Sequence, residues 1–173
     1  MIRDTQNIED DICRDKRLIK EMLINDPDIV ELLNNPNISS DNPEDLIDIN
    51  IFDYIRIPGT ISEVKNYICF DIDFTEPSKF NDYMKIKQYI FYVYCHSDNI
   101  KTNYGVSRHD LLGYLIRENF AYSNKFGIKI HPIRNTPGVM DSFYSSRKII
   151  FEQITTNDTY RNVKMNRYES NSR

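Results

Sequence analysis

The first third of the chain carries apolar residues at helical spacing. Asp26 and Pro27 suit a helix N-cap and a first helical position, which predicts a second short helix through Leu33. The stretch NNPNISSDNPED then collects turn-forming residues and predicts an exposed loop. The residues that predict one apolar side of the first helix are Ile8, Ile12, Leu18, Ile19, Met22 and Leu23.

Apolar and polar residues alternate beyond this loop, which is typical of strands. Residues 63–75 predict a half-buried strand. Residues 84–96 predict a central strand, because apolar residues occupy both odd and even positions from Tyr89 onward. A hairpin with a polar tip at residues 76–82 is the simplest connection between them. Further predicted strands are residues 128–133 and 143–155, linked by the turn RNTPGVMD, and a candidate short strand at residues 54–57.

The clearest helix signal lies between the two pairs of strands. Ser107 can cap it, Asp110 stands three residues later, and Leu and Ile recur at helical spacing as far as Phe120. The helix is expected over residues 107–126, with Gly127 ending it in a left-handed turn. The order predicts an α+β fold, in which N-terminal helices precede a mainly antiparallel sheet of about four strands packed on one long helix as a two-layer sandwich.

Charge divides the chain into unequal parts. The net charge is -4, but residues 1–58 hold 14 acidic and 6 basic side chains, whereas residues 59–173 hold 12 acidic and 16 basic ones. We therefore expect an acidic helical segment over residues 1–58, an α+β core over 59–156 and a basic, flexible arm over 157–173. Two surfaces of opposite charge favour self-association or a charged partner, although one solvated acidic face explains the same numbers.

Length and composition describe a single aromatic-rich domain. With 173 residues and 40% apolar content the chain can bury a sizeable core, and no apolar run approaches the roughly 18 residues of a membrane span. No signal peptide is evident in the first residues. Cys13, Cys69 and Cys95 form no CxxC pair, so they are expected to stay reduced in the cytosol or in a particle assembled there.

Enzymatic chemistry finds little support in the residue pattern. Cys95 and His96 are neighbours on a strand and point to opposite faces, so they form no dyad, and we expect a buried Cys beside a surface His. His109 and His131 are isolated, no zinc spacing or phosphate loop occurs, and the carboxylates of Asp71 and Asp73 suit the solvent side of a strand. We expect no enzyme, no cofactor and no metal.

Two binding alternatives remain open at this point. Asp53, Glu63 and Lys65 form the carboxylate and lysine pattern of Mg²⁺-dependent nucleases, although alternating strands produce such pairs often. An aromatic strand with nearby lysines could stack on nucleic acid, but core packing and a pI near 5.4 favour no specific nucleic acid as partner. The residues in question are Tyr89, Phe91, Tyr92 and Tyr94 with Lys85 and Lys87.

One segment, IKQYIFYVYCHSDNIKTNYGVSRHDLLGYLIRENF, combines an aromatic strand, a polar loop ending in Gly105, Arg108 just inside a helix, and a Leu-rich amphipathic helix. It resembles the central part of bacteriophage neck (head-tail connector) proteins of the tail terminator and tail-completion type, over residues 60–156. The resemblance implies a structural virion protein that forms a ring, typically of six subunits. Such a ring ends the tail tube and joins the tail to the head connector.

The resemblance also implies partners and interface residues. Gly105 would allow the turn, and Arg108 would face a neighbouring subunit or cap the interface electrostatically. Lys101, Tyr104 and His109, from the same segment, complete the candidate subunit interface. The expected partners are other copies of the chain and neighbouring neck, connector and tail-tube proteins, with no membrane. Assembly is expected in the cytoplasm of a host bacterium, and the final location in the virion. A small Mg²⁺-dependent nuclease and an α+β adaptor domain are the alternatives.

Overall fold

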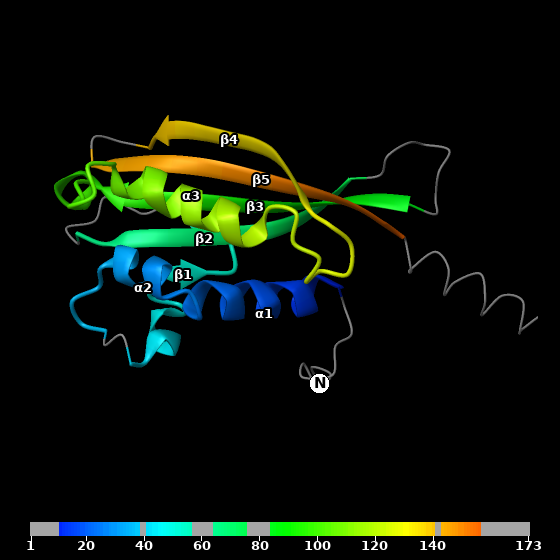
Figure 1. The fold of residues 1–173 in the computed structure, drawn as a ribbon, viewed down its shortest axis with the longest axis horizontal. Coiled ribbons are helices and arrows are strands. Elements are labelled where there is room, and N and C mark those ends of the chain that lie inside the picture. Colours follow the sequence, from blue (N-terminus) through cyan, green and yellow to red (C-terminus); the bar gives the residue numbers. More distant parts are fainter. Residues whose placement is uncertain (1–10, 39–40, 57–63, 76–83, 141–142, 157–173) are drawn as a thin grey trace, which may run out of the picture.

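A five-stranded sheet forms the centre of the protein (Figure 1). The computed structural model describes residues 11–38, 41–56, 64–75, 84–140 and 143–156. The strand order is β1-β2-β3-β5-β4, with β1 parallel to β2 and all other neighbours antiparallel. The strands are β1 (Ile51–Phe52), β2 (Asn66–Thr75), β3 (Met84–His96), β4 (His131–Val139) and β5 (Tyr144–Thr156).

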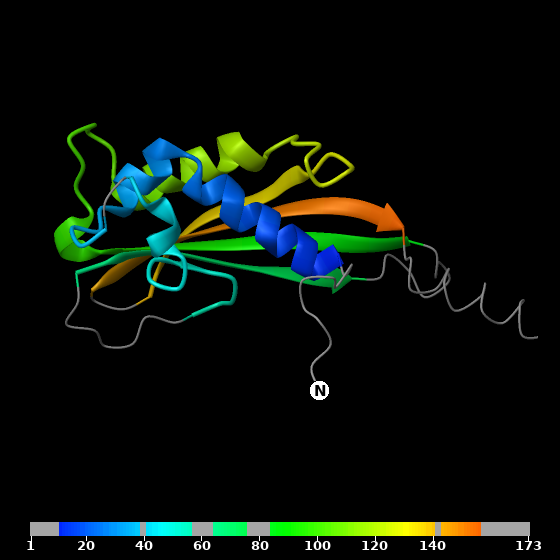
Figure 2. The ribbon, with the colours of Figure 1, turned by 90° about the horizontal axis from the view of Figure 1, so that it is seen from below.

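Three α-helices in the described part of the chain lie against one face of the sheet (Figure 2). They are α1 (Asp11–Ile24), α2 (Pro27–Leu33) and α3 (Arg108–Phe120), and short 3-10 turns cover η2 (Pro43–Leu46) and η3 (Ser97–Asn99). Asp26 caps α2 as predicted, because its carboxylate accepts from the backbone N–H groups of Asp28 and Ile29. The α+β class is confirmed, but the sheet has five strands where about four were expected, and α1 and α2 pack on it together with α3.

Alternate apolar side chains of β2, β3 and β5 face the helices. Ile68, Phe70 and Ile72 of β2 are buried in one cluster that also contains Phe91 of β3 and Leu23 of α1. The N-terminal helices therefore share the core of the sheet. Burial of this continuous apolar surface supplies most of the driving force that holds the two layers together.

A second, smaller cluster lies on the opposite face of the sheet, at the β1 end. It packs Phe52, Tyr67 and Cys69 against Tyr94 and Tyr144. This cluster explains why both faces of β3 are apolar in its second half, since a central strand there is buried on both sides.

The end of α3 differs from the sequence prediction. The helix stops at Phe120, because the next residue, Ala121, is extended (φ -62°, ψ 128°). Tyr122 then adopts a left-handed conformation (φ 61°), and its N–H donates to Ile130 O. Gly127 does have a positive φ of 87°, but it belongs to a separate turn, in which its N–H donates to Asn124 O. Phe126 thus leaves the helix and packs beside Tyr89 in the core.

The predicted turn RNTPGVMD is also wrong for the most part, since residues 134–139 belong to β4. Pro137 and Gly138 suggested a turn, yet they pair with Arg147 and Ser146 of β5. A sheet edge tolerates this sequence, because one side of an edge strand has no ladder to complete and proline's missing N–H can point outward.

The short strand expected at residues 54–57 lies earlier. Ile51 and Phe52 form β1 and are buried, whereas Tyr54 and Ile55 are exposed and outside any strand. The start of β2 is later than predicted, at Asn66. The hairpin tip at residues 76–82, the basic arm at 157–173, Glu63 and Ile57 lie outside the described residues.

A polar network crosses the core between α1 and the sheet. The Nζ of Lys87 lies 2.7 Å from Asp15 Oδ2, and the Tyr89 hydroxyl donates to the same oxygen at 2.8 Å. Gln153 completes the network, with its amide donating to the carbonyls of Phe126 and Ile128. These bonds join α1, β3, β5 and the loop after α3, so the buried charge is held between several elements.

Candidate interaction surface

The loop between β3 and α3 holds most of the candidate interface residues. Thr102 Oγ1 donates to Val106 O at 2.5 Å and accepts from the N–H of Tyr104 at 3.3 Å. Gly105 adopts φ 74°, a conformation that favours glycine, which agrees with the turn expected there. The loop therefore has a defined shape that presents Tyr104, 63% exposed, and Val106, 48% exposed.

Arg108 holds this loop in place through hydrogen bonds to backbone carbonyls of its own chain. Its Nε donates to Asn99 O at 2.7 Å, Nη1 donates to Leu32 O at 2.8 Å, and Nη2 reaches Lys101 O at 3.5 Å. The Leu32 carbonyl lies in the last turn of α2, where a cation is favourable for the helix dipole. The guanidinium thus joins η3, the loop and α2, and the role at a neighbouring subunit expected for Arg108 remains a prediction.

An apolar groove opens between α2 and α3 beside the loop, with a volume of about 370 Å³. We call it the α2–α3 groove. Its lining comes from α2 (Asp28, Glu31, Leu32), the loop (Tyr104, Val106) and α3 (Leu111, Leu115). The two charged residues among these seven are both acidic, so the groove combines an apolar floor with a negative rim.

Tyr104 closes one side of the groove through a contact with α2. Its hydroxyl donates to Glu31 Oε1 at 3.1 Å. The hydrogen bond to Glu31, together with the charge of that carboxylate, raises the pKa of Tyr104. The same contact holds the loop against α2, so Tyr104, a predicted interface residue, is bonded directly to the acidic rim of the groove.

Asp110, with the ring of His109 beside it, contacts Arg147 of β5 at the start of α3. Asp110 accepts from the Ser107 hydroxyl at 2.6 Å and from Arg147 Nε at 2.8 Å. Burial alone would raise the pKa of Asp110, but the bonds from Ser107 and Arg147 and the nearby charges outweigh it and lower that pKa. Burial lowers the pKa of His109, whose ring lies beside Asp110. The contact between Asp110 and Arg147 joins α3 to the sheet.

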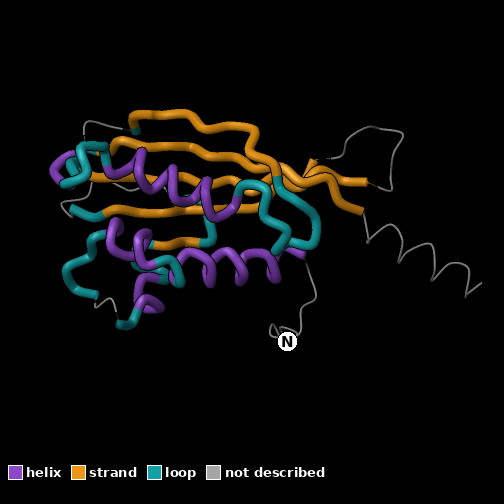
Figure 3. The backbone as a smooth tube through the Cα atoms, viewed as in Figure 1, coloured by secondary structure: helices purple, strands orange, loops and turns teal. Residues whose placement is uncertain are grey.

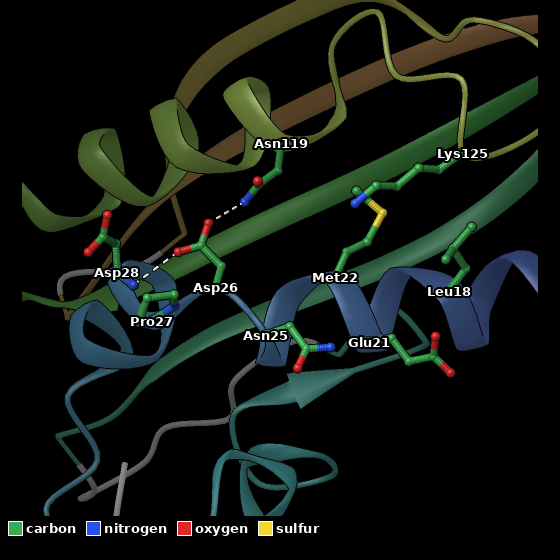
Figure 4. A pocket seen from close by; sticks show the side chains of 9 residues that line it. All are labelled: Leu18, Glu21, Met22, Asn25, Asp26, Pro27, Asp28, Asn119 and Lys125. Atoms are coloured by element: carbon green, nitrogen blue, oxygen red, sulfur yellow. Dashed lines mark hydrogen bonds between the residues drawn. The ribbon is translucent and has the colours of Figure 1, made fainter. Parts of the chain in front are cut away.

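A second pocket, of about 550 Å³, lies where α1 passes into α2 (Figure 4). Asp26 projects from this junction and accepts from the Asn119 amide of α3, so the pocket and the N-cap of α2 share one carboxylate. Met22 and Lys125 extend toward each other across the opening. Asp28 lines both pockets, so the α2–α3 groove and this pocket are neighbours at the start of α2.

The structure does not assemble the candidate nuclease site in its described part. Asp53 forms an ion pair with Lys20 at 2.6 Å, and its backbone carbonyl accepts from Lys16. Glu63 lies outside the described residues, and Lys65 precedes β2. Within the described ranges, no three His, Cys, Asp or Glu residues gather closely enough to hold a metal ion.

The other sequence candidates divide between the two faces of the sheet. Cys95 is buried in the main core, where burial raises its pKa to about 12. His96 is buried as well, contrary to the surface position expected, because Phe143 and Tyr144 pack against its ring. Its Nδ1 accepts from the N–H of Asp98, so it caps η3.

The aromatic residues of β3 pack on both faces of the sheet, as expected if they serve the core and not nucleic-acid binding. Tyr89 and Phe91 are buried toward the helices. Tyr92 stacks on Tyr94 on the opposite face, where the Lys148 ammonium lies 4.9 Å from the Tyr92 ring centroid. The strand therefore offers no continuous row of exposed rings.

Sequence reasoning missed the α2–α3 groove. Helical spacing placed Leu111 and Leu115 on the apolar side of the predicted helix. Both are half-buried and line the groove, whereas Leu112 and Ile116 are buried. The signal was the width of the apolar face of α3, which carries two stripes at i and i+4. The acidic rim came from α2, and no sequence pattern connects α2 with a helix that starts 75 residues further on.

These features define an α+β protein whose helical layer carries an acidic-rimmed apolar groove. None of the described helices is long and apolar enough to cross a membrane. Residues 26–153 match the YomW family, and the chain belongs to that family. The family is named after a gene of a Bacillus phage or prophage, which associates the protein with phages. No curated protein and no solved structure matches the chain.

Proposed function

We propose that this protein is a structural component of a tailed phage that forms a ring in the neck. The ring would end the tail tube and join the tail to the head connector, with other neck, connector and tail-tube proteins as its neighbours. The family links the chain to phages. The single observation that carries the proposal is the α2–α3 groove, because it lies at the loop and helix that resemble tail terminator and tail-completion proteins.

A closed ring requires two different surfaces on each subunit, one to meet the other on the next copy. The groove is one such surface, with exposed Tyr104 and Val106 beside half-buried leucines. The far edge of the sheet offers another, since β4 pairs on one side with β5 and carries Val139, 81% exposed. Edge strands with exposed apolar residues are typical sites for contact with a second chain.

The oligomeric state in solution tests this function directly. We expect native mass spectrometry in low salt to find a closed ring, with six as the expected number of subunits, or a monomer that forms rings when a tail-tube protein is added. Negative-stain electron microscopy should show the ring. A protein that stays monomeric and binds neither tail-tube nor connector proteins would refute the proposal.

Variants in the groove locate the contact. Arg108 is unsuitable, because Arg108→Glu would break bonds to Asn99 and Leu32 within the chain. Tyr104→Ser combined with Val106→Ser removes exposed apolar surface and should reduce ring formation. Ile49→Ser is the matched control, since Ile49 is 42% exposed and lies away from the groove. Equal ring formation by all three proteins would exclude the groove as the contact.

A further inference from the structure

The last strand directs the chain away from the α2–α3 groove. Tyr144 starts β5 opposite His96, at the end of the sheet where the loop before α3 begins. Arg147 of β5 contacts Asp110 at the start of α3. From Arg147 to Thr156 the strand continues for nine residues, about 30 Å at a rise near 3.3 Å per residue. Figure 1 shows β5 ending at the side of the sheet opposite to α2.

The sequence after β5 is chemically complementary to the groove. Arg161, Lys164 and Arg167 recur at three-residue intervals. Apolar side chains stand between and beside them: Tyr160, Val163, Met165 and Tyr168. A basic and apolar segment matches an apolar floor with an acidic rim, because each cation can approach a carboxylate while its neighbours enter the groove.

Within its own chain, the same segment would have to return along β5 to meet the groove. Arg161 is five residues beyond Thr156 and Lys164 is eight, so full extension carries their backbones at most about 18 and 29 Å. This reach is restricted further by the return of about 30 Å along β5, since Figure 1 shows α2 and the end of β5 at opposite sides of the sheet. A second copy of the chain has no such restriction.

We propose that the α2–α3 groove of one copy receives residues 160–168 of a second copy. Asp28 and Glu31 pair with the basic side chains of the arm, and Leu32, Val106 and Leu115 contact its apolar ones. Each copy donates one arm and accepts another, which is a heterologous contact that links copies head to tail. The proposal deepens the ring function above and rests on it for the closure of the ring, but the contact itself can be measured separately.

A labelled peptide measures the contact without ring formation. The probe is a fluorescent synthetic peptide of residues 157–173, and the binding partner is the full chain with Arg161→Glu, Lys164→Glu and Arg167→Glu, whose own arm is repelled by the groove. Fluorescence anisotropy should detect binding that weakens as salt is raised, since the charge pairs are screened. Adding Asp28→Lys and Glu31→Lys should weaken it by about tenfold or more, equivalent to about 1.4 kcal/mol.

The matched control carries Glu44→Lys and Asp45→Lys, the same charge change on exposed residues of η2 outside the groove. It should leave peptide affinity within about twofold of the parent, and far-UV circular dichroism should show that all variants are folded. Equal affinity of the groove variant and this control would overturn the proposal.

Mixing two full-length variants tests whether the contact joins separate copies. The chain with the reversed arm and the chain with the reversed groove should each fail to associate alone. Their mixture should recover association, because each acidic partner again meets a basic one. A mixture that stays monomeric overturns the proposal, and so does a wild-type protein that remains monomeric although the peptide binds the groove, since the arm would then bind within its own chain.

The outcomes separate this proposal from the proposed function. Rings of wild-type protein without peptide binding would refute the arm contact and leave the neck function standing. Peptide binding and rescue by mixing, in a protein that forms open chains and is missing from purified virions, would support the arm contact and refute the neck function.

Discussion

Replacing Lys87 by Met should destabilise the protein strongly, because it removes one half of a buried ion pair. The side chains of Lys87 and Asp15 are 2% and 0% exposed and lie 2.7 Å apart. Methionine has a similar length, so the change leaves little cavity and acts mainly through charge. Asp15 then keeps the Tyr89 hydroxyl at 2.8 Å and Arg14 at 3.2 Å as partners.

The magnitude follows from what remains around Asp15. Removing one member of a buried ion pair costs about 3–5 kcal/mol, and the remaining partners offset part of this, so we expect about 3 kcal/mol. For a domain of this size that lowers the melting temperature by about 6–12 °C. The double change Asp15→Leu with Lys87→Met removes both buried charges of the pair, and Tyr89 can donate to Gln153, whose Oε1 lies 3.2 Å away. Its stability should return to within about 1 kcal/mol of wild type.

Urea unfolding followed by far-UV circular dichroism measures these differences, since the chain has no Trp to report by fluorescence. Lys129→Met is the matched control, because Lys129 is exposed and should change stability by about 0.5 kcal/mol or less. A loss below about 1 kcal/mol for Lys87→Met, or a double variant as unstable as the sum of its single changes, would contradict the reasoning.

Three further results are expected. The pKa of Asp110 is lowered in the folded protein, so its carboxylate stabilises the fold above the unfolded-state pKa of 3.8 and loses this effect as the pH falls through the folded-state pKa. In urea unfolding, the stability difference between wild type and Asp110→Asn should therefore shrink at low pH, and an unchanged difference would exclude the contribution. Burial raises the pKa of Cys69 to about 11 and that of Cys95 to about 12, so in the folded protein at pH 8 Ellman's reagent should react with Cys13 before either, and equal rates for all three thiols would contradict this. Gly105→Ala should cost about 1 kcal/mol in urea unfolding, because φ 74° strains a residue with a Cβ; a neutral effect would mean that the loop rearranges at no cost.

The elements with strong period were predictable. The alternation in β2 and the aromatic run of β3 located both strands, and β3 has the predicted bounds Met84–His96. The cap at Asp26 placed the start of α2. Predictions from turn residues succeeded less well, since Pro137 and Gly138 lie in β4 and the left-handed residue that follows α3 is Tyr122. Pairing with a neighbouring strand decided the first case, and packing of Phe126 against Phe120 and Tyr89 accompanies the second.

The candidate site was predictable only in part. The polar loop before the helix was visible in the sequence, and the turn at Gly105 was expected from the resemblance to phage neck proteins. The sequence did not indicate that Arg108 would bind three carbonyls of its own chain. A charged side chain at the start of a helix can face solvent, a partner or a neighbouring element, and local pattern carries no information on which of these is present.

By itself the sequence determined the α+β class, the paired central strands and the unequal charge of the two parts of the chain. These properties depend on local periodicity and composition, which short stretches of residues fix. The tertiary structure alone decided that Asp15 and Lys87 meet in the core, and that Asp28 and Glu31 of α2 form a rim beside Leu111 and Leu115 of α3. Such contacts join residues about 70 to 90 positions apart, and packing of whole elements, not spacing along the chain, brings them together.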